Sequence, residues 1–249
     1  MARYTIDFYA KHLARRVNVS LVIPSLNLHE TLNNKNPSYY QDRKEQYPLA
    51  IFLCGFGDNK EAWLRNMNID SLCEKNKIAG LFIDGENKWY LNQGAIDDHY
   101  HFIEEDLLDF VYGNFTCLSK EMPLIIAGVS MGGYGAMYHY LTNTGKYKAC
   151  IALSPAVKPD FLDETKFGSL RDHFLANKDK ELNVYLAIGE NDFIIGQSRE
   201  FNDFLISNVK NVEYKFVPKK DHSWDFWREE IYPIFDYLKN LGIIGRSAA

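Results

Sequence analysis

The stretch of residues 123–140, PLIIAGVSMGGYGAMYHY, constrains the fold of this chain more than any other. Its apolar run, residues 124–127, is long enough for a buried strand and too short for a helix. The run leads into GVSMG, a G-x-S-x-G pentapeptide, and the residues behind it favour the start of a helix. A strand, a sharp turn and a helix in this order predict that the turn presents the hydroxyl of Ser130 in a cleft at the edge of a sheet.

The glycines of this turn have a local physical reason. A serine in a strained strand-to-helix turn needs neighbours without a Cβ, because the backbone folds back closely on itself. The helix that follows presents free N–H groups and the positive end of its dipole, so the backbone N–H of Met131 is a candidate donor to an oxyanion. The alternative is a glycine-rich turn with an idle serine. Because G-x-S-x-G is frequent by chance, the prediction depends on the flanking strand and helix.

Length and composition narrow the class of protein. The chain has 249 residues, 46% of them hydrophobic, which predicts a single domain over residues 1–249 with a sizeable core. The net charge is −5 without a basic stripe, so we expect no nucleic-acid partner. We find neither a stretch of membrane-spanning length nor an N-terminal signal peptide, and we expect no membrane partner. Four widely spaced cysteines fit free thiols in a reducing compartment, which predicts a cytoplasmic protein. The sequence does not determine the oligomeric state, and a homo-oligomer is left open.

Apolar runs typical of strands alternate with segments of helical period along the chain. The strand-like runs are residues 4–9, 15–23, 49–53, 78–84, 124–127, 149–153, 184–188 and 212–217. The helical segments are residues 60–75, 98–117 and 198–209, the helix behind Ser130, and an amphipathic helix at the end of the chain. This alternation predicts the α/β class, with a mostly parallel central sheet and helices on both faces.

Three segments differ from this alternation. Residues 25–47 are polar and lack a helical period, which predicts a surface loop. Residues 156–180 mix polar residues with phenylalanine and leucine, and we expect a partly helical, cap-like insertion there. The acidic residues among positions 97–106 predict a solvated helix face. His99 and His101 lack a third ligand nearby, so we expect no metal site.

Three residues suited to nucleophilic catalysis each follow a predicted strand. They are Ser130, Asp192 and His222, and parallel strands bring the loops at their carboxyl ends to one rim of the sheet. A serine hydroxyl needs a base that titrates near neutral pH, and the histidine needs a carboxylate that fixes its tautomer. We predict Ser130 as nucleophile, His222 as general base and Asp192 as the orienting acid. Glu190 and Asp221 are the alternative acids, although Asp221 adjoins the histidine and is poorly placed to orient it.

Other loops at the same rim provide candidates for the rest of the site. The glycine-containing loop of residues 54–59 suggests the backbone N–H of Phe56 as a second oxyanion donor beside Met131, with a tight turn as the alternative. Aromatic residues in these loops are candidates for lining a substrate pocket, or they pin the loops to the core. The candidate pocket residues are Trp89, Tyr90, Phe193 and Trp224.

Four segments carry a resemblance to a known family. They are GVSMGGYGA at residues 128–136, KWYLN at 88–92, GDNKEAW at 57–63 and HSWDFW at 222–227. With them the chain resembles the esterase D-like branch of the α/β hydrolases, and most closely the bacterial tributyrin esterases. The likeness extends over nearly the whole chain, and its S-M-G-G-Y-G and H-x-W-x-x-W patterns are more specific than G-x-S-x-G alone.

The resemblance implies an α/β-hydrolase fold and a cytosolic serine carboxylesterase without a cofactor. Such an enzyme hydrolyses short-chain acyl esters, which are small-molecule substrates, through a Ser-His-Asp triad and an acyl-enzyme. One departure is Cys54-Gly55, where the family often has His-Gly. Related branches leave a cinnamoyl (feruloyl) esterase, a carbohydrate deacetylase or an acyltransferase as alternatives. A catalytically silent binding protein is disfavoured, because all three triad residue types are present.

Overall fold

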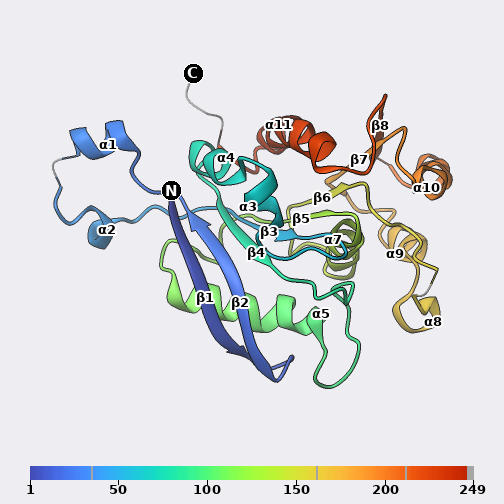
Figure 1. Ribbon diagram of the computed structural model, residues 1–249, viewed down its shortest axis with the longest axis horizontal. Coiled ribbons are helices and arrows are strands. Elements are labelled where there is room, and N and C mark those ends of the chain that lie inside the picture. Colours follow the sequence, from blue (N-terminus) through green and yellow to red (C-terminus); the bar gives the residue numbers. More distant parts are fainter. Residues whose placement is uncertain (35, 161, 211, 246–249) are drawn as a thin grey trace.

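One sheet organises the computed structural model, which describes residues 1–34, 36–160, 162–210 and 212–245 (Figure 1). Among these residues the sheet has 8 strands in the order β1-β2-β4-β3-β5-β6-β7-β8. The strands are β1 (Ala2–Ala10), β2 (Arg15–Ile23), β3 (Leu49–Leu53), β4 (Ala79–Ile83), β5 (Leu124–Val129), β6 (Ala149–Leu153), β7 (Val184–Gly189) and β8 (Glu213–Val217). The β1–β2 and β2–β4 pairs are antiparallel and the remaining pairs are parallel. The prediction of a mostly parallel sheet is confirmed.

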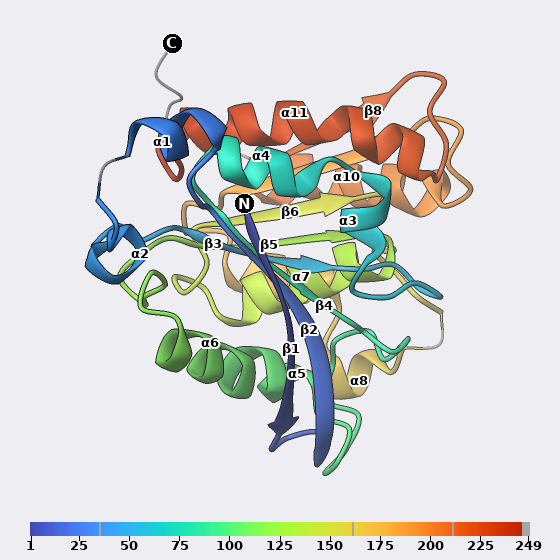
Figure 2. The same cartoon turned by 60° about the vertical axis from the view of Figure 1, so that its left-hand side comes forward.

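Helices cover both faces of this sheet, as Figure 2 shows. Helices α3, α4 and α11 pack on one face, and η1, α6, α7, α9 and α10 pack on the other, so that each face has its own apolar core. The helices are α1 (Leu28–Asn33), α2 (Tyr39–Asp42), α3 (Ala62–Asn66), α4 (Ile69–Lys75), α5 (His99–His101), the π-helix η1 (Phe102–Leu107), α6 (Leu108–Asn114), α7 (Met131–Thr142), α8 (Glu164–Phe167), α9 (Leu170–Ala176), α10 (Ile195–Asn208) and α11 (Trp224–Asn240).

The central strands owe their apolar sequences to this double coverage. Every residue of β3, β4, β5 and β6 is buried. Parallel strands that are covered on both faces have unbroken apolar runs instead of an alternating pattern. The order of β5, β6, β7 and β8 in the sheet then places the loops that follow them next to one another at one rim.

The prediction of a surface loop over residues 25–47 is wrong in part, because the segment contains α1 and α2. A capping box starts α1: the Asn27 side chain accepts a hydrogen bond from the Glu30 N–H, and the Glu30 carboxylate accepts one from the Asn27 N–H, each at 2.8 Å. Neither helix buries a residue. An apolar period, which is the main sequence signal of a helix, is therefore missing.

The acidic part of the 98–117 helix also differs from its prediction. Asp98 and Glu104 are only 7% and 9% exposed, so they do not belong to a solvated face. Asp98 accepts a hydrogen bond from Asn92, and Glu104 accepts hydrogen bonds from Lys146 and Tyr147. These hydrogen bonds compensate the burial of the two carboxylates, and the partners of Glu104 lie 42 and 43 residues away, where sequence spacing alone does not reveal them.

Several remaining expectations concern helices and cysteines. The expected helix over residues 60–75 is divided into α3 and α4, and the 98–117 helix contains the π-helical segment η1. The 156–180 insertion contains α8 and α9, with Phe161 outside the described residues. All four cysteines are buried free thiols. No helix in the described part of the chain is both long and apolar enough to span a membrane.

Candidate active site

Ser130 occupies a strained turn between β5 and α7. Its backbone has φ 55° and ψ −116°, a conformation that residues other than glycine rarely adopt. A side-chain carbon on Gly128 would lie 2.0 Å from the carbonyl oxygen of Gly132, and one on Gly132 would lie 2.4 Å from that of Leu53. These distances are far below van der Waals contact, so the two glycines of G-x-S-x-G are required by the close approach of backbone.

Hydrogen bonds anchor this turn to the end of β6. The Ser130 N–H donates to the carbonyl of Leu153 at 2.9 Å, and the Ser130 carbonyl accepts from the N–H groups of Tyr134 and Ala156 at 3.1 and 3.2 Å. The surrounding structure therefore fixes the strained conformation. It leaves the half-buried Ser130 side chain at the rim of the sheet.

Asp192 and His222 form a hydrogen-bonded pair beside this rim. The distance between Asp192 Oδ2 and His222 Nδ1 is 2.8 Å, with the aspartate side chain fully buried and the histidine side chain 14% exposed. The other carboxylate oxygen, Oδ1, accepts the N–H of Ile194 at 3.0 Å. Because a carboxylate oxygen accepts hydrogen bonds, Nδ1–H donates to Asp192, and Nε2 is left for another partner.

Two other carboxylates are not placed to orient His222. Glu190 is exposed, and Asp221 accepts a hydrogen bond from the hydroxyl of Ser223. The structure thus pairs His222 with Asp192, as the loop positions after β7 and β8 suggest. These two loops lie against each other, because a side-chain carbon on Gly189 would lie 2.1 Å from the carbonyl oxygen of Lys220.

Aromatic contacts connect His222 with the Ser130 turn. The His222 ring lies 5.1 Å from the ring of Trp227, whose Nε1–H donates to Ser154 Oγ at 3.0 Å. Ser154 directly follows Leu153, which accepts the Ser130 N–H. Ser130 and His222 do not hydrogen-bond to each other directly in the structure. Such nucleophile–base bonds are often long without substrate and tighten in its complex.

The loop after β3 lies against Ser130. A side-chain carbon on Gly55 would be 3.5 Å from the Ser130 Cβ, which places the next residue, Phe56, beside the serine. Within the described part of the chain, the backbone N–H groups of Phe56 and Met131 have no acceptor. Two free N–H donors next to a serine are what stabilisation of an oxyanion requires.

A hollow of about 640 Å³ lies beside the loop that carries Phe56. One side consists of Phe56 and residues of the segment after β4, including Trp89. The other side belongs to the 156–180 insertion. The insertion residues that line it are Leu162, Asp163, Lys166 and Phe167. The sequence left open whether the apolar residues Leu162 and Phe167 contact an acyl group or the core, and no pattern indicated Asp163 and Lys166. A mixed polar and apolar segment has the same composition whether it faces a hollow or the core.

The four aromatic candidates for the pocket have different surroundings. Trp89 lines the hollow although it is only 7% exposed, and Phe193 is 79% exposed with its ring 4.6 Å from that of His222. Trp224 is half-buried and packs edge-on against Trp63.

The placement of Tyr90 at a pocket surface is wrong. Tyr90 is fully buried, and its hydroxyl donates to the carbonyl of Cys54 at 2.9 Å. The cause is local: Trp89 and Tyr90 have φ values of 60° and 61°, so the backbone turns and sends the tyrosine side chain into the core.

No group of histidine, cysteine, aspartate and glutamate side chains in the described residues is arranged to hold a metal ion. The chemistry available at this rim is that of a serine hydroxyl, an imidazole oriented by a buried carboxylate, and two free backbone N–H groups. These are the parts needed for nucleophilic acyl transfer.

The mostly parallel sheet, the strained serine turn after β5 and the Ser-Asp-His order define an α/β hydrolase. Comparison with known proteins identifies the family more narrowly. The chain belongs to the Esterase family, whose model, described as "Putative esterase", matches residues 23–238.

Known relatives agree with this assignment. The chain is 24% identical to the acetyl esterase of Caldicellulosiruptor saccharolyticus over 97% of this chain and 99% of the relative. The S-formylglutathione hydrolase of Staphylococcus aureus superposes with a TM-score of 0.76 at 20% identity, over 95% of this chain and 98% of that chain. A ferulic acid esterase from Anaeromyces mucronatus superposes with a TM-score of 0.68 at 17% identity, over 93% and 88% of the two chains. The protein is therefore a carboxylic ester hydrolase with an esterase D-like α/β-hydrolase fold.

Proposed function

We propose that this protein is a serine carboxylesterase that hydrolyses short-chain acyl esters of small molecules through an acyl-enzyme. The observation that carries the proposal is the buried Asp192–His222 hydrogen bond beside the strained Ser130 turn. Ser130 is the nucleophile, His222 the general base and acid, and Asp192 the residue that orients the imidazole.

In the acylation step, His222 Nε2 takes the proton from Ser130 Oγ as this oxygen attacks the ester carbonyl carbon. The carbonyl oxygen becomes an oxyanion and accepts hydrogen bonds from the backbone N–H groups of Phe56 and Met131. The C–O bond to the alcohol then breaks, and the imidazolium gives its proton to the leaving oxygen. An acyl-Ser130 ester and a free alcohol result.

In the deacylation step, water replaces the alcohol. His222 removes a proton from the water as it attacks the acyl-Ser130 carbonyl, and the second tetrahedral intermediate uses the same two N–H donors. Collapse of this intermediate returns the proton to Ser130 Oγ and releases the carboxylic acid. Asp192 stabilises the imidazolium in both steps, and its burial keeps water from competing for Nδ1–H.

The proposal of a short acyl group rests on the acetyl esterase relative, which aligns over 97% of this chain. The proposal of a cap rests on the hollow, because residues of the 156–180 insertion form one of its sides. We further propose a cytoplasmic location, which the four buried free thiols support.

A cinnamoyl esterase is the second candidate, because aromatic side chains surround the hollow. Phe56, Trp89 and Phe167 all line it, and aromatic rings stack favourably with a hydroxycinnamoyl group. The fold of the ferulic acid esterases is also the fold of this chain.

A substrate series tests both candidates. Purified protein is assayed with p-nitrophenyl esters from acetate to octanoate and with methyl hydroxycinnamates, with Ser130→Ala as the matched control. Activity that is highest on short acyl chains and absent in the variant supports the short-chain esterase. A preference for hydroxycinnamates supports the second candidate. Product analysis with added alcohols identifies an acyltransferase, and equal inertness of both proteins on every ester contradicts the hydrolase mechanism.

A further inference from the structure

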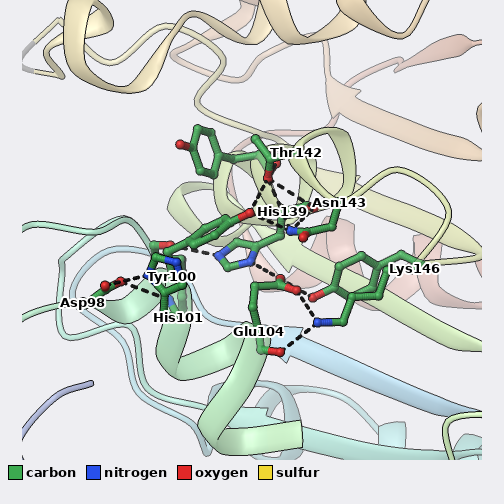
Figure 3. A network of polar contacts seen from close by, with 11 residues as sticks. Asp98, Tyr100, His101, Glu104, His139, Thr142, Asn143 and Lys146 are labelled. Carbon is green, nitrogen blue, oxygen red and sulfur yellow. Dashed lines mark hydrogen bonds and ion pairs between the residues drawn. The ribbon is translucent and has the colours of Figure 1, made fainter. Parts of the chain in front are cut away.

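A buried polar network connects η1, α7, the loop after α7 and the segment after β4 (Figure 3). Its centre is His139 of α7, which is completely buried. His139 Nδ1 lies 2.5 Å from Glu104 Oε1, and His139 Nε2 lies 2.9 Å from the carbonyl oxygen of Tyr90. Glu104 also accepts hydrogen bonds from Lys146 Nζ and from the hydroxyl of Tyr147, each at 2.6 Å. None of these residues has a part in the acyl-transfer steps.

The hydrogen-bond acceptors around His139 indicate which ring nitrogen donates to which partner. The Tyr90 carbonyl only accepts hydrogen bonds, so Nε2 carries a proton. Burial raises the pKa of Glu104, but its hydrogen bonds and charge interaction with His139 and its contacts with Lys146 and Tyr147 outweigh burial and hold the pKa below its usual value. Glu104 Oε1 lies within hydrogen-bond distance of Nδ1, so the ring is held at both nitrogens, between the Glu104 carboxylate and the Tyr90 carbonyl.

The carbonyl that receives Nε2–H belongs to a backbone segment in an uncommon conformation. Trp89 and Tyr90 both have positive φ, which is unfavourable for successive aromatic residues. The Tyr90 ring is also tightly enclosed. A side-chain carbon on Gly85 would lie 2.4 Å from the ring, and one on Gly135 would lie 2.6 Å from it. The hydrogen bond from His139 Nε2–H and the two glycines together fix where the Tyr90 side chain points.

The Tyr90 side chain ends at the loop proposed to stabilise the oxyanion. Its hydroxyl donates to the Cys54 carbonyl at 2.9 Å and lies 3.3 Å from Cys54 Sγ. Only Gly55 separates the Cys54 carbonyl from the N–H of Phe56, and glycine has no side chain that would restrict its own rotation. The hydrogen bond from Tyr90 fixes the peptide group on one side of Gly55, and this limits the directions in which the Phe56 N–H can point.

We propose that Tyr90 is a positioning residue for the Phe56 N–H, and that the Glu104–His139 pair holds Tyr90 in place. The inference rests on the proposed function, since it assigns the Phe56 N–H to an oxyanion. It predicts a defect specific to the transition state, because a displaced donor weakens the tetrahedral intermediate more than it weakens substrate binding.

Three variants and one matched control test the proposal. Tyr90→Phe keeps the enclosed ring and removes only the hydroxyl that contacts Cys54. His139→Leu removes the donor to the Tyr90 carbonyl, whereas His139→Gln keeps an N–H in reach of it. The control is Tyr140→Phe, one residue further along α7. This change also removes a buried hydroxyl, which accepts a 2.9 Å hydrogen bond from the Asn183 N–H. Asn183 does not belong to the loop that carries Phe56.

We expect Tyr90→Phe and His139→Leu to lower kcat about tenfold or more with KM changed less than about twofold, as for loss of part of an oxyanion donor. Binding of a trifluoromethyl ketone, whose adduct carries an oxyanion, is expected to weaken by the same factor as kcat/KM. His139→Gln is expected to recover much of the loss, and Tyr140→Phe to keep the kcat of the unmodified protein. Hydrogen exchange in a peptide covering residues 54–58 should become faster in Tyr90→Phe and not in Tyr140→Phe.

Two results overturn the inference while the proposed function stands. One is a Tyr90→Phe protein with unchanged kcat, inhibitor binding and loop exchange. The other is an equal loss of kcat in Tyr90→Phe and Tyr140→Phe, which indicates general loosening of the core. Ester hydrolysis that persists in Ser130→Ala contradicts the proposed function, and the inference with it.

Discussion

At the scale of single residues, Asp192 is a carboxylate whose side chain is fully buried, and its hydrogen bonds explain why it is tolerated there. Both of its oxygens accept hydrogen bonds, one from His222 and one from the backbone of Ile194. A carboxylate held in this way keeps the histidine in the tautomer in which Nδ1 carries the proton and Nε2 is free to accept one.

Asp192→Asn is therefore expected to keep the fold and to lose activity. An amide at this position can donate to Nδ1 and favour the wrong tautomer, which costs about four orders of magnitude in kcat in a triad of this kind. Steady-state kinetics and circular dichroism check this prediction. Glu190→Gln is the matched control, because Glu190 is exposed on the same loop. Equal losses in the two variants would show that His222 does not depend on Asp192.

At the scale of secondary-structure elements, the site depends on how closely β5 and α7 approach β3. Gly132 lies against the carbonyl of Leu53, at the end of the strand that leads into the loop carrying Phe56. The same element contact thus sets the distance between the serine turn and the loop that carries Phe56.

Gly132→Ala is expected to destabilise the protein by roughly 3 kcal/mol or more, since an added carbon 2.4 Å from backbone forces the elements apart. Chemical denaturation measures this change. Gly196→Ala in α10 is the control, because the space around Gly196 is open. It is expected to change stability by no more than about 1 kcal/mol. Similar stabilities for the two variants would contradict the packing described here.

At this scale the sequence was most informative for the strands. Unbroken apolar runs such as Leu49–Leu53 predicted buried parallel strands, and the loops that follow them contain Ser130, Asp192 and His222. Patterns set by distant partners were not visible. The carboxylate of Glu104 is buried because Lys146 and Tyr147 contact it, and Tyr90 turns inward because of its positive φ. Sequence periodicity reports the faces of an element but not such long-range pairs.

At the scale of the whole molecule, the network around Glu104 connects the π-helix η1, α7, the loop after α7 and the segment after β4. Its stabilising contribution depends on the charge of Glu104. The pKa of Glu104 in the folded protein is lowered from its usual value of 4.5, so the unfolded chain binds the proton more readily. The contribution is therefore complete above pH 4.5 and is lost as the pH falls through the folded-state pKa.

Glu104→Gln should consequently be less stable than the unmodified protein at neutral pH, with a difference that narrows in acid. Denaturant unfolding of both proteins at a series of pH values, from neutral pH down to well below 4.5, measures this difference. A stability difference that is independent of pH would show that the Glu104 charge does not contribute.

The proposal that Ser130 forms an acyl-enzyme is tested most directly by trapping this species. The protein is mixed with p-nitrophenyl acetate, quenched in acid within one turnover and analysed by intact-mass and peptide mass spectrometry. We expect one acetyl group on the peptide that contains Ser130, a burst of p-nitrophenol of matching size, and neither signal in Ser130→Ala. Steady hydrolysis with no acetylated peptide, at a rate that Ser130→Ala retains, would contradict the proposal.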